Sequence, residues 1–409
     1  MSKMETIPEP IPSAAQPEFD TTKLILPVVG AVSFVHLLND LIQAVLPSIY
    51  PMLKTDYNLS FTQVGLITLV FQLTASFLQP AIGFYTDKYP KPYLLPFGMV
   101  FNLLGLIMLA VVDSFALLLL ASAFIGLGSS AFHPEASRVA RTASGGRFGF
   151  AQSFFQVGGN TGSALGPLLA AAIIIPRGQG SIGWFTVFAV LGILVLLSVS
   201  RWTIRTQQFY KASAKHNRQH NLSRNKVVGA LVILSILVFS KYVYMTSLAN
   251  YYTFYLIEKF DQPVASAQLF LFLFLAAVAV GTFAGGPIGD RIGRKLVLWV
   301  SILGVAPFTL LLPYCNLFWT GVIMVFIGLV LSSAFSAIIV FAQELVPNKV
   351  GLISGIFYGL MFGFSGISAA ALGALADSTD IIFVFKCCSF LPLLGIVIMF
   401  LPKVEYAKH

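Results

Sequence analysis

The sequence predicts an all-α membrane protein with twelve transmembrane helices in two six-helix, pseudo-symmetric bundles. Composition is the first reason: 57% of the 409 residues are hydrophobic and only 10% are charged, whereas soluble domains carry about 25% charged residues. The second reason is a regular series of apolar stretches, each long enough to cross a bilayer. The third is an internal repeat at about half the chain length. Large soluble domains are therefore excluded.

The apolar stretches are joined by short polar connections, except at 204–225, which is long, polar and basic. We place the spans at 24–53, 61–86, 93–112, 115–140, 149–175, 183–203, 226–257, 264–289, 296–314, 317–342, 350–376 and 381–402. We therefore expect a bundle at 23–203, a cytoplasmic linker at 204–225 and a second bundle at 226–402. The polar ends, 1–22 and 403–409, are expected to be disordered tails.

The net charge of +9 comes from 25 Lys and Arg against 16 Asp and Glu. Cytoplasmic loops of membrane proteins accumulate Lys and Arg. With both termini in the cytoplasm, 20 of the 25 basic residues fall on that side. This asymmetry predicts the orientation. It also explains the basic charge without nucleic-acid binding, for which the chain has no basic, aromatic-interleaved soluble module.

The internal repeat is clearest in the connections after spans two and eight. Gly, Asp and two basic residues recur there 203 positions apart, and two such halves predict a substrate cavity between them near the bilayer midplane. We expect these connections to form a cytoplasmic latch that breaks when the halves rock. Its members are Gly83, Asp87, Lys88, Gly286, Asp290, Arg291 and Arg294.

The pattern G-x-x-x-D-[KR]-x-x-[KR] in these connections resembles the signature of the major facilitator superfamily of secondary transporters. The stretch GPIGDRIGRK at 286–295 fits it almost fully, whereas YPKP at 89–92 departs from it in the first copy. Span five partly resembles the antiporter motif of that superfamily: Gly162, Gly166 and Pro167 fit, and alanines at 170–171 replace its last two glycines.

Longer strings, such as HLLNDLIQAV at 36–45 and FQLTASFLQPAIGFYTDKYP at 71–90, resemble members of the superfamily in enteric bacteria that export fosmidomycin-like phosphonate drugs. The resemblance implies the major facilitator fold and proton-driven antiport that confers antibiotic resistance. It also implies a monomer in the bacterial inner membrane. The partners are then a small anionic drug, protons and the lipid bilayer, and no cofactor is expected.

Ionised groups inside a span cost about 2.5–3.5 kcal/mol each, so each one needs a reason. Asp40 lies near the middle of span one and shares a helix face with His36 and Asn39, and span four carries a second cluster. A carboxylate whose surroundings change between two states can bind and release a proton. The candidates for proton coupling are Asp40, Glu135, Arg138, His36 and His133. The alternative to proton coupling is a purely structural role, as a static ion pair and as a buried acid whose hydrogen bonds are satisfied.

An anionic substrate needs a cation in the cavity. Lys241, near the middle of span seven, and Arg138 are the available residues, and tyrosines with a common helix face follow Lys241. The alternative is an aromatic stripe that packs span seven. Span five carries a polar stripe that we expect to line the cavity. The full set of substrate-binding candidates is Lys241, Arg138, Asn39, Gln152, Gln156, Asn160, Tyr244, Tyr251 and Tyr255.

Other functions remain open from the residues alone. A proton symporter that imports a phosphorylated or carboxylated metabolite uses the same acidic groups with the opposite coupling. An intramembrane enzyme is disfavoured because the sequence has no H-E-x-x-H zinc pair and no G-x-S-x-G elbow, so we expect neither catalysis nor a metal site. A receptor or channel fits the two-half repeat less well than alternating access does.

Overall fold

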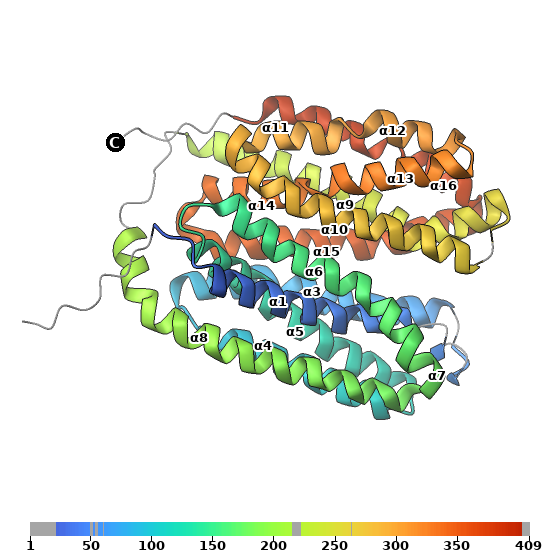
Figure 1. The fold of residues 1–409 in the computed structure, drawn as a ribbon, viewed down its shortest axis with the longest axis horizontal. Helices are drawn as coiled ribbons and strands as arrows, with labels where there is room; N and C mark the ends of the chain where they lie inside the picture. The colour runs from blue at the N-terminus through green and yellow to red at the C-terminus, as the bar shows by residue number, and fades with distance from the viewer. Residues whose placement is uncertain are drawn as a thin grey trace, which may run out of the picture.

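The computed structural model describes residues 22–49, 52–53, 56–59, 61–214, 222–262 and 264–402. Within these ranges the secondary structure is helical, without strands. The long helices run along one common direction, and the two halves of the chain form two layers that face each other (Figure 1). The predicted all-α membrane fold is confirmed.

The first half contains six long helices. Polar and glycine-rich turns separate them, and Gly145 and Gly146 between α5 and α6 adopt positive φ angles of 56° and 86° that glycine tolerates without strain. The elements are α1 (Leu26–Ser48), α3 (Phe61–Lys88), α4 (Leu94–Val111), α5 (Phe115–Thr142), α6 (Phe148–Leu169), η1 (Ala170–Ile174), α7 (Ile175–Arg177), η2 (Gln179–Phe185) and α8 (Thr186–Ala214).

In the second half, several spans are divided into shorter helical pieces. Prolines stand at the start of α12 and η6, where a missing backbone N–H costs least. The elements are α9 (Arg224–Phe260), α10 (Val264–Ile292), α11 (Arg294–Leu298), η3 (Trp299–Leu303), α12 (Ala306–Leu311), η4 (Leu312–Tyr314), α13 (Leu317–Ser332), α14 (Ala334–Leu345), η5 (Pro347–Lys349), α15 (Val350–Ser378), α16 (Ile381–Cys388) and η6 (Leu391–Phe400).

Eleven helical segments in the described ranges are long and apolar enough to cross a membrane. Helix α6 is not among them, and it carries the polar side chains of Gln152, Gln156 and Asn160. Of the expected linker 204–225, residues 204–214 continue helix α8, and 215–221 lie outside the described residues. Positions 1–21 and 403–409, where we expected tails, also lie outside them.

The halves pack against each other mainly through α3 with α15 and α6 with α10. The approach is closest at one end of the molecule, where α3 and α10 finish, and we call this the latch end. At Gly83 of α3 an added Cβ atom would collide with the backbone of Gly351 in α15. Small residues let helix backbones approach closely in membranes. The described halves are therefore closed against each other at the latch end.

Candidate functional site

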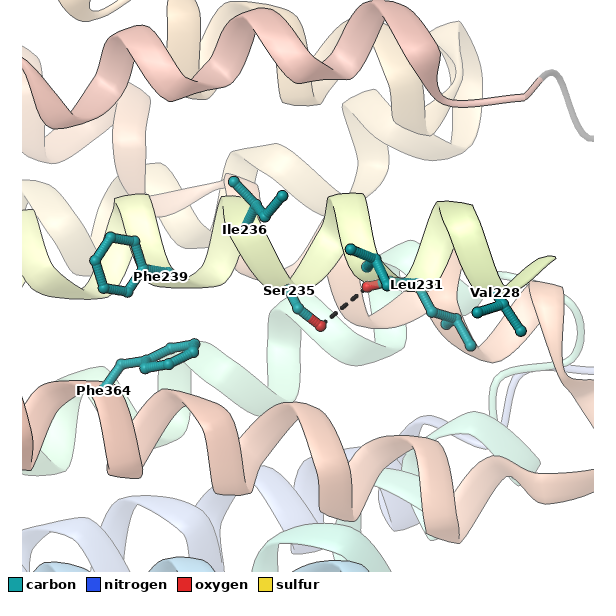
Figure 2. Close-up of a pocket in the computed structure, with 7 residues that line it drawn as sticks. Val228, Leu231, Ser235, Ile236, Phe239 and Phe364 are labelled. Carbon is teal, nitrogen blue, oxygen red and sulfur yellow. Dashed lines mark hydrogen bonds between the residues drawn. The ribbon is translucent and has the colours of Figure 1, made fainter. Parts of the chain in front are cut away.

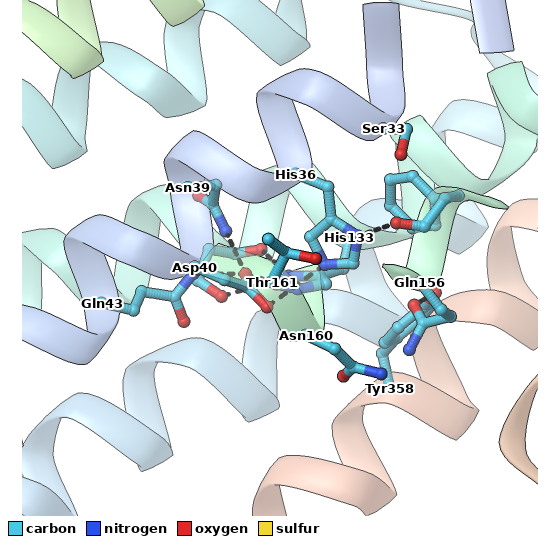
Figure 3. Close-up of polar contacts among 12 residues, drawn as sticks. Ser33, His36, Asn39, Asp40, Gln43, His133, Gln156, Asn160, Thr161 and Tyr358 are labelled. Carbon is cyan, nitrogen blue, oxygen red and sulfur yellow. Dashed lines mark hydrogen bonds and ion pairs between the residues drawn. The ribbon is translucent and has the colours of Figure 1, made fainter. Parts of the chain in front are cut away.

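A carboxylate and two imidazoles from different helices meet in the first half (Figure 3). The carboxylate of Asp40 in α1 lies with Oδ2 at 3.4 Å from His36 Nε2 and Oδ1 at 3.6 Å from His133 Nε2 of α5. The imidazole side chains are 2% and 1% exposed, whereas Asp40 is 19% exposed. We call these three residues the Asp40 triad. The carboxylate is therefore less enclosed than its two partners.

Two amides orient the carboxylate of Asp40. Asn39 Nδ2 donates to Asp40 Oδ1 at 2.9 Å, and Gln43 Nε2 donates to the same oxygen at 3.3 Å. Asn39 in turn accepts a hydrogen bond from Asn102 of α4 at 2.8 Å. The side-chain amide of Asn39 is therefore hydrogen-bonded to the carboxylate of Asp40 and does not project freely into a cavity. The sequence analysis did not single out Asn102, because one amide in an apolar span carries no helical pattern.

Backbone carbonyls determine how the two imidazoles are protonated. His36 Nδ1 lies 2.8 Å from the carbonyl oxygen of Phe155, and His133 Nδ1 lies 3.0 Å from that of Ser129. A carbonyl oxygen only accepts, so each Nδ1 carries a hydrogen atom and donates it. Both Nε2 atoms then point at one carboxylate.

Glu135 and Arg138 form a separate cluster nearer the latch end. Arg138 NH2 donates to Glu135 Oε2 at 2.5 Å, and Arg138 NH1 donates to the carbonyl oxygen of Thr86 at 2.7 Å. The same NH1 lies 3.9 Å from Asp87 Oδ1. Successive helix residues are turned by about 100°, so Glu135 faces almost opposite to His133. Arg138 thus connects a buried acid to the latch, and not to the Asp40 triad.

The acidic residues of the two repeated connections each bond to a helix of the other half. Asp87 accepts from the backbone N–H groups of Gly351 and Leu352 at 2.8 Å each, at the start of α15. Asp290 accepts from those of Gly149 and Phe150 at 3.0 and 2.8 Å, at the start of α6. A carboxylate at a helix N-terminus satisfies free N–H groups and interacts favourably with the helix dipole.

The remaining latch candidates lie around these contacts. Arg294 NH2 lies 2.8 Å from Asp290 and 3.1 Å from Glu344, so it joins α11 to α10 and α14 within the second half. Lys88 and Arg291 are exposed at the helix ends. Gly286 lies within α10. The two aspartates and Gly83 therefore make the contacts between halves, and the basic residues surround them.

Tyr358 of α15 joins the halves at the level of the triad. Its hydroxyl accepts from Gln152 Nε2 at 2.9 Å and donates to Gln156 Oε1 at 2.8 Å, both on α6. Its ring lies 5.1 Å from the ring of His133. Asn160, one helical turn beyond Gln156, donates to Thr282 of α10 at 2.7 Å. The polar stripe of α6 therefore faces the other half of the protein in this conformation.

The sequence analysis did not identify Tyr358, because the residues around it are small and apolar and form no polar pattern with it. The internal repeat carried a weak signal for it, since the position 203 residues earlier is Phe155. The Phe155 ring stacks on His36 with 4.0 Å between ring centroids. Each histidine of the triad thus has an aromatic residue from one of the two equivalent helices, α6 and α15, against it.

Lys241 of α9 is a buried cation, 4% exposed. Its Nζ donates to the carbonyl oxygen of Ser332 at 3.2 Å and lies 5.0 and 5.6 Å from the rings of Tyr242 and Phe335. None of the ion pairs within the described ranges involves it. A charged ammonium group at this position would have no counter-ion among the described residues, which is costly.

The three candidate tyrosines of α9 contact other elements of the second half. Tyr251 donates to the carbonyl oxygen of Ala369 at 2.7 Å. Tyr255 stacks on Phe385 of α16 with ring centroids 4.2 Å apart. The hydroxyl of Tyr244 is buried without a hydrogen-bond partner. In this conformation these rings pack the second half, and Lys241 makes its contacts with Ser332, Tyr242 and Phe335.

A groove of about 520 Å³ runs between α9 and α15. Figure 2 shows its lining, which is apolar apart from Ser235. The hydroxyl of Ser235 donates to the carbonyl oxygen of Leu231 at 2.9 Å. Without a charged group in its lining, this groove suits an apolar chain such as a lipid tail and lacks what an anionic ligand needs.

Residues 32–371 and 234–409 match the family model described as Major Facilitator Superfamily. The chain is 56% identical over 401 residues to the fosmidomycin resistance protein of Escherichia coli (strain K12), which covers 98% of both proteins. It is 41% identical to the uncharacterized MFS-type transporter YfnC of Bacillus subtilis (strain 168), over 94% of this chain and 95% of that one. The outward conformation of FucP from E. coli superposes with a TM-score of 0.72 at 15% identity, covering 93% of this chain and 99% of that one.

Proposed function

We propose that this chain, which belongs to the Major Facilitator Superfamily, is a proton-coupled antiporter. It exports fosmidomycin-like anionic drugs by alternating access. The chain is a multi-pass membrane transporter and not an enzyme. Its E. coli relative is named for resistance to fosmidomycin, which supports export of a small phosphonate drug. The distribution of Lys and Arg supports placing the latch end and both termini in the cytoplasm. We expect a monomer in the bacterial inner membrane.

The observation that carries the proposal is the Asp40 triad. A proton carrier in an alternating-access cycle must reach solvent in one state and be shielded from it in another. Asp40 is partly exposed, and the two imidazoles against it are enclosed. Because both Nδ1 atoms donate to backbone carbonyls, the proton that the triad gains or loses lies between an Nε2 and the carboxylate. Glu135, paired with Arg138, is the second candidate carrier.

Lys241 supports an anionic cargo. It is the buried cation of the second half that lacks an ion pair among the described residues, and it lies on α9, the counterpart of α1. A phosphonate that binds there would neutralise a charge that the protein leaves uncompensated. Proton site and anion site then stand in opposite halves. Rocking of the halves would alter the surroundings of both.

The latch and Tyr358 supply the contacts that must break for the cytoplasmic side to open. Asp87 and Asp290 bond to helix starts in the opposite half, and Tyr358 bonds to Gln152 and Gln156 deeper in the interface. Symmetric contacts of this kind favour two discrete arrangements of the halves. The described conformation is then the one closed toward the cytoplasm.

Drug flux in inside-out membrane vesicles tests the proposal. With an acid lumen, an antiporter accumulates the phosphonate inside the vesicle, whereas a symporter that imports metabolites would expel it. Asp40→Asn should abolish gradient-driven accumulation while the protein still inserts. Asp261→Asn is the matched control, because Asp261 lies in the left-handed region with φ of 51°, which asparagine tolerates equally well. Normal accumulation in Asp40→Asn would remove the triad from the coupling role.

A further inference from the structure

We propose that the Asp40 triad is also a binding site for a divalent transition-metal ion of the Zn²⁺ class. Two imidazole nitrogens and one carboxylate are a ligand set that such ions prefer. The sequence offered no sign of this site, because the ligands come from α1 and α5, far apart along the chain. The inference goes beyond drug export and does not require that the triad carry the transported proton.

The ligand atoms stand near coordination spacing. The three atoms lie within 4.8 Å of one another, with 3.4 Å between His36 Nε2 and Asp40 Oδ2 and 3.6 Å between His133 Nε2 and Asp40 Oδ1. Four ligands at the usual zinc distances of about 2.0–2.1 Å stand roughly 3.3 Å apart in a tetrahedron. The two imidazole–carboxylate distances are already close to that spacing, and the 4.8 Å limit leaves at most about 1.5 Å of adjustment between any two of the three atoms.

The groups behind the ligands are those that metal sites use. Histidine ligands almost always donate the other ring nitrogen to a carbonyl or carboxylate, which aims the free nitrogen at the metal. Both histidines do so here, to Phe155 and Ser129. The carboxylate is likewise held, by Asn39 and Gln43. The triad is thus oriented before any ion arrives.

A glycine keeps space open beside the ligands. At Gly159 of α6, an added Cβ atom would stand 2.5 Å from His36 Nε2 and 2.6 Å from Asp40 Oδ2. Gly159 therefore places no side chain of its own against these two ligand atoms. Asp40 is 19% exposed and is the least enclosed of the three ligands, and a water molecule would serve as the fourth ligand.

Charge favours the ion as well. With both Nδ1 atoms protonated, the Nε2 lone pairs of His36 and His133 both face the carboxylate of Asp40. Asn39 and Gln43 direct their donors to a single carboxylate oxygen. A cation would neutralise the negative charge at this place. In the proposed transport cycle that cation is a proton, whereas a divalent ion would be coordinated by all three ligand atoms at once.

Direct binding to the full-length protein in detergent tests the site. The other three histidines, His216, His220 and His409, lie outside the described residues and can chelate metal by themselves. They are therefore replaced by alanine in a tag-free background chain. Competition for Zn²⁺ with a chromophoric chelator should show one bound ion per background chain. X-ray absorption of that ion should show imidazole nitrogen ligands.

Two variants separate the site from general folding effects. His133→Ala removes a ligand and should weaken Zn²⁺ binding at least about tenfold. Gly159→Ala keeps every ligand but fills the open side, and should weaken it similarly. Gly30→Ala on α1 is the matched control, since an added Cβ atom there meets nothing within 4 Å. Should His133→Ala fail to elute as a single peak, Gly159→Ala decides the matter.

The proposal is overturned if the background chain binds no Zn²⁺, or if it binds the ion equally well with His133→Ala and Gly159→Ala. Either result would leave the triad as a proton site alone. It would not contradict the proposal of drug export, because binding is measured without transport. Inhibition of drug flux by Zn²⁺ in the background chain is the expected functional counterpart, and this measurement rests on the proposed function.

Discussion

Replacing Tyr358 with phenylalanine tests whether the interface hydrogen bonds hold the protein closed at the latch end. Tyr358→Phe keeps the ring that lies 5.1 Å from His133 and removes only the hydroxyl. The two hydrogen bonds to Gln152 and Gln156, at 2.9 and 2.8 Å, are lost together. Both partners are buried, so their amides are left without that partner in the closed state and regain water when the halves part.

The size of the effect follows from that difference between states. A buried donor or acceptor left without a partner costs about 1–3 kcal/mol. Two such groups should therefore destabilise the closed conformation by about 2–6 kcal/mol relative to the open one. A shift of that size changes the ratio of the two populations by roughly 30-fold to about 25,000-fold. Even a strongly closed transporter would then populate the open state measurably.

Pulsed electron paramagnetic resonance distances across the latch end measure the populations. Tyr89 and Ile292 suit the two spin labels, because they are equivalent in the repeat, lie in opposite halves and are 49% and 53% exposed. The native cysteines, Cys315, Cys387 and Cys388, are replaced first. Tyr358→Phe should add a longer-distance population that the labelled parent chain lacks or shows weakly.

Tyr252→Phe is the matched control. The hydroxyl of Tyr252 is also buried, but it has no hydrogen-bond partner, so its removal should leave the distances unchanged. An unchanged distribution in Tyr358→Phe, or the same change in both variants, would refute the reasoning. The first outcome would mean that the other contacts between the halves, such as the latch and the bond from Asn160 to Thr282, keep them together without the Tyr358 hydroxyl.

Three further predictions concern other contacts. Lys241→Met removes a buried charge without a counter-ion, so it should raise the thermal unfolding temperature, with a stabilisation of about 1–4 kcal/mol. The same variant should bind the phosphonate much more weakly in a direct binding assay, and a variant that is both less stable and still binds would contradict the assignment. Asp290→Asn weakens two charge-assisted bonds to the start of α6, each worth about 1.5–3 kcal/mol, so drug turnover should change while drug affinity, measured on the purified protein, stays near the parent value. Gly83→Ala places a methyl group against the backbone of Gly351, so labels at 89 and 292 should report an open latch end; a closed distribution would show that α3 and α15 can shift apart without cost.

Fold class was readable from the sequence because hydropathy is a property of contiguous residues. Lipid is the solvent for an apolar stretch of about 20 residues whatever its neighbours are. The twelve stretches, the half-chain repeat and the polar residues inside spans therefore followed from composition and spacing. A repeat also puts equivalent residues at equivalent depths, which located Asp87 and Asp290 at the same end of the molecule.

The partners of those residues were decided only by the tertiary structure. His36 and Asp40 share a helix face by spacing, but that His133 of α5 completes the triad depends on how α1 and α5 are rotated and how closely they approach. Helix rotation is set by packing between residues distant in sequence, as where Gly158 of α6 lies against Ser33 of α1. Periodicity within one helix contains no such information. For the same physical reason, the role of Tyr358, the separation of Glu135 from the triad and the metal-ligand spacing at Asp40 emerged only once the helices were in place.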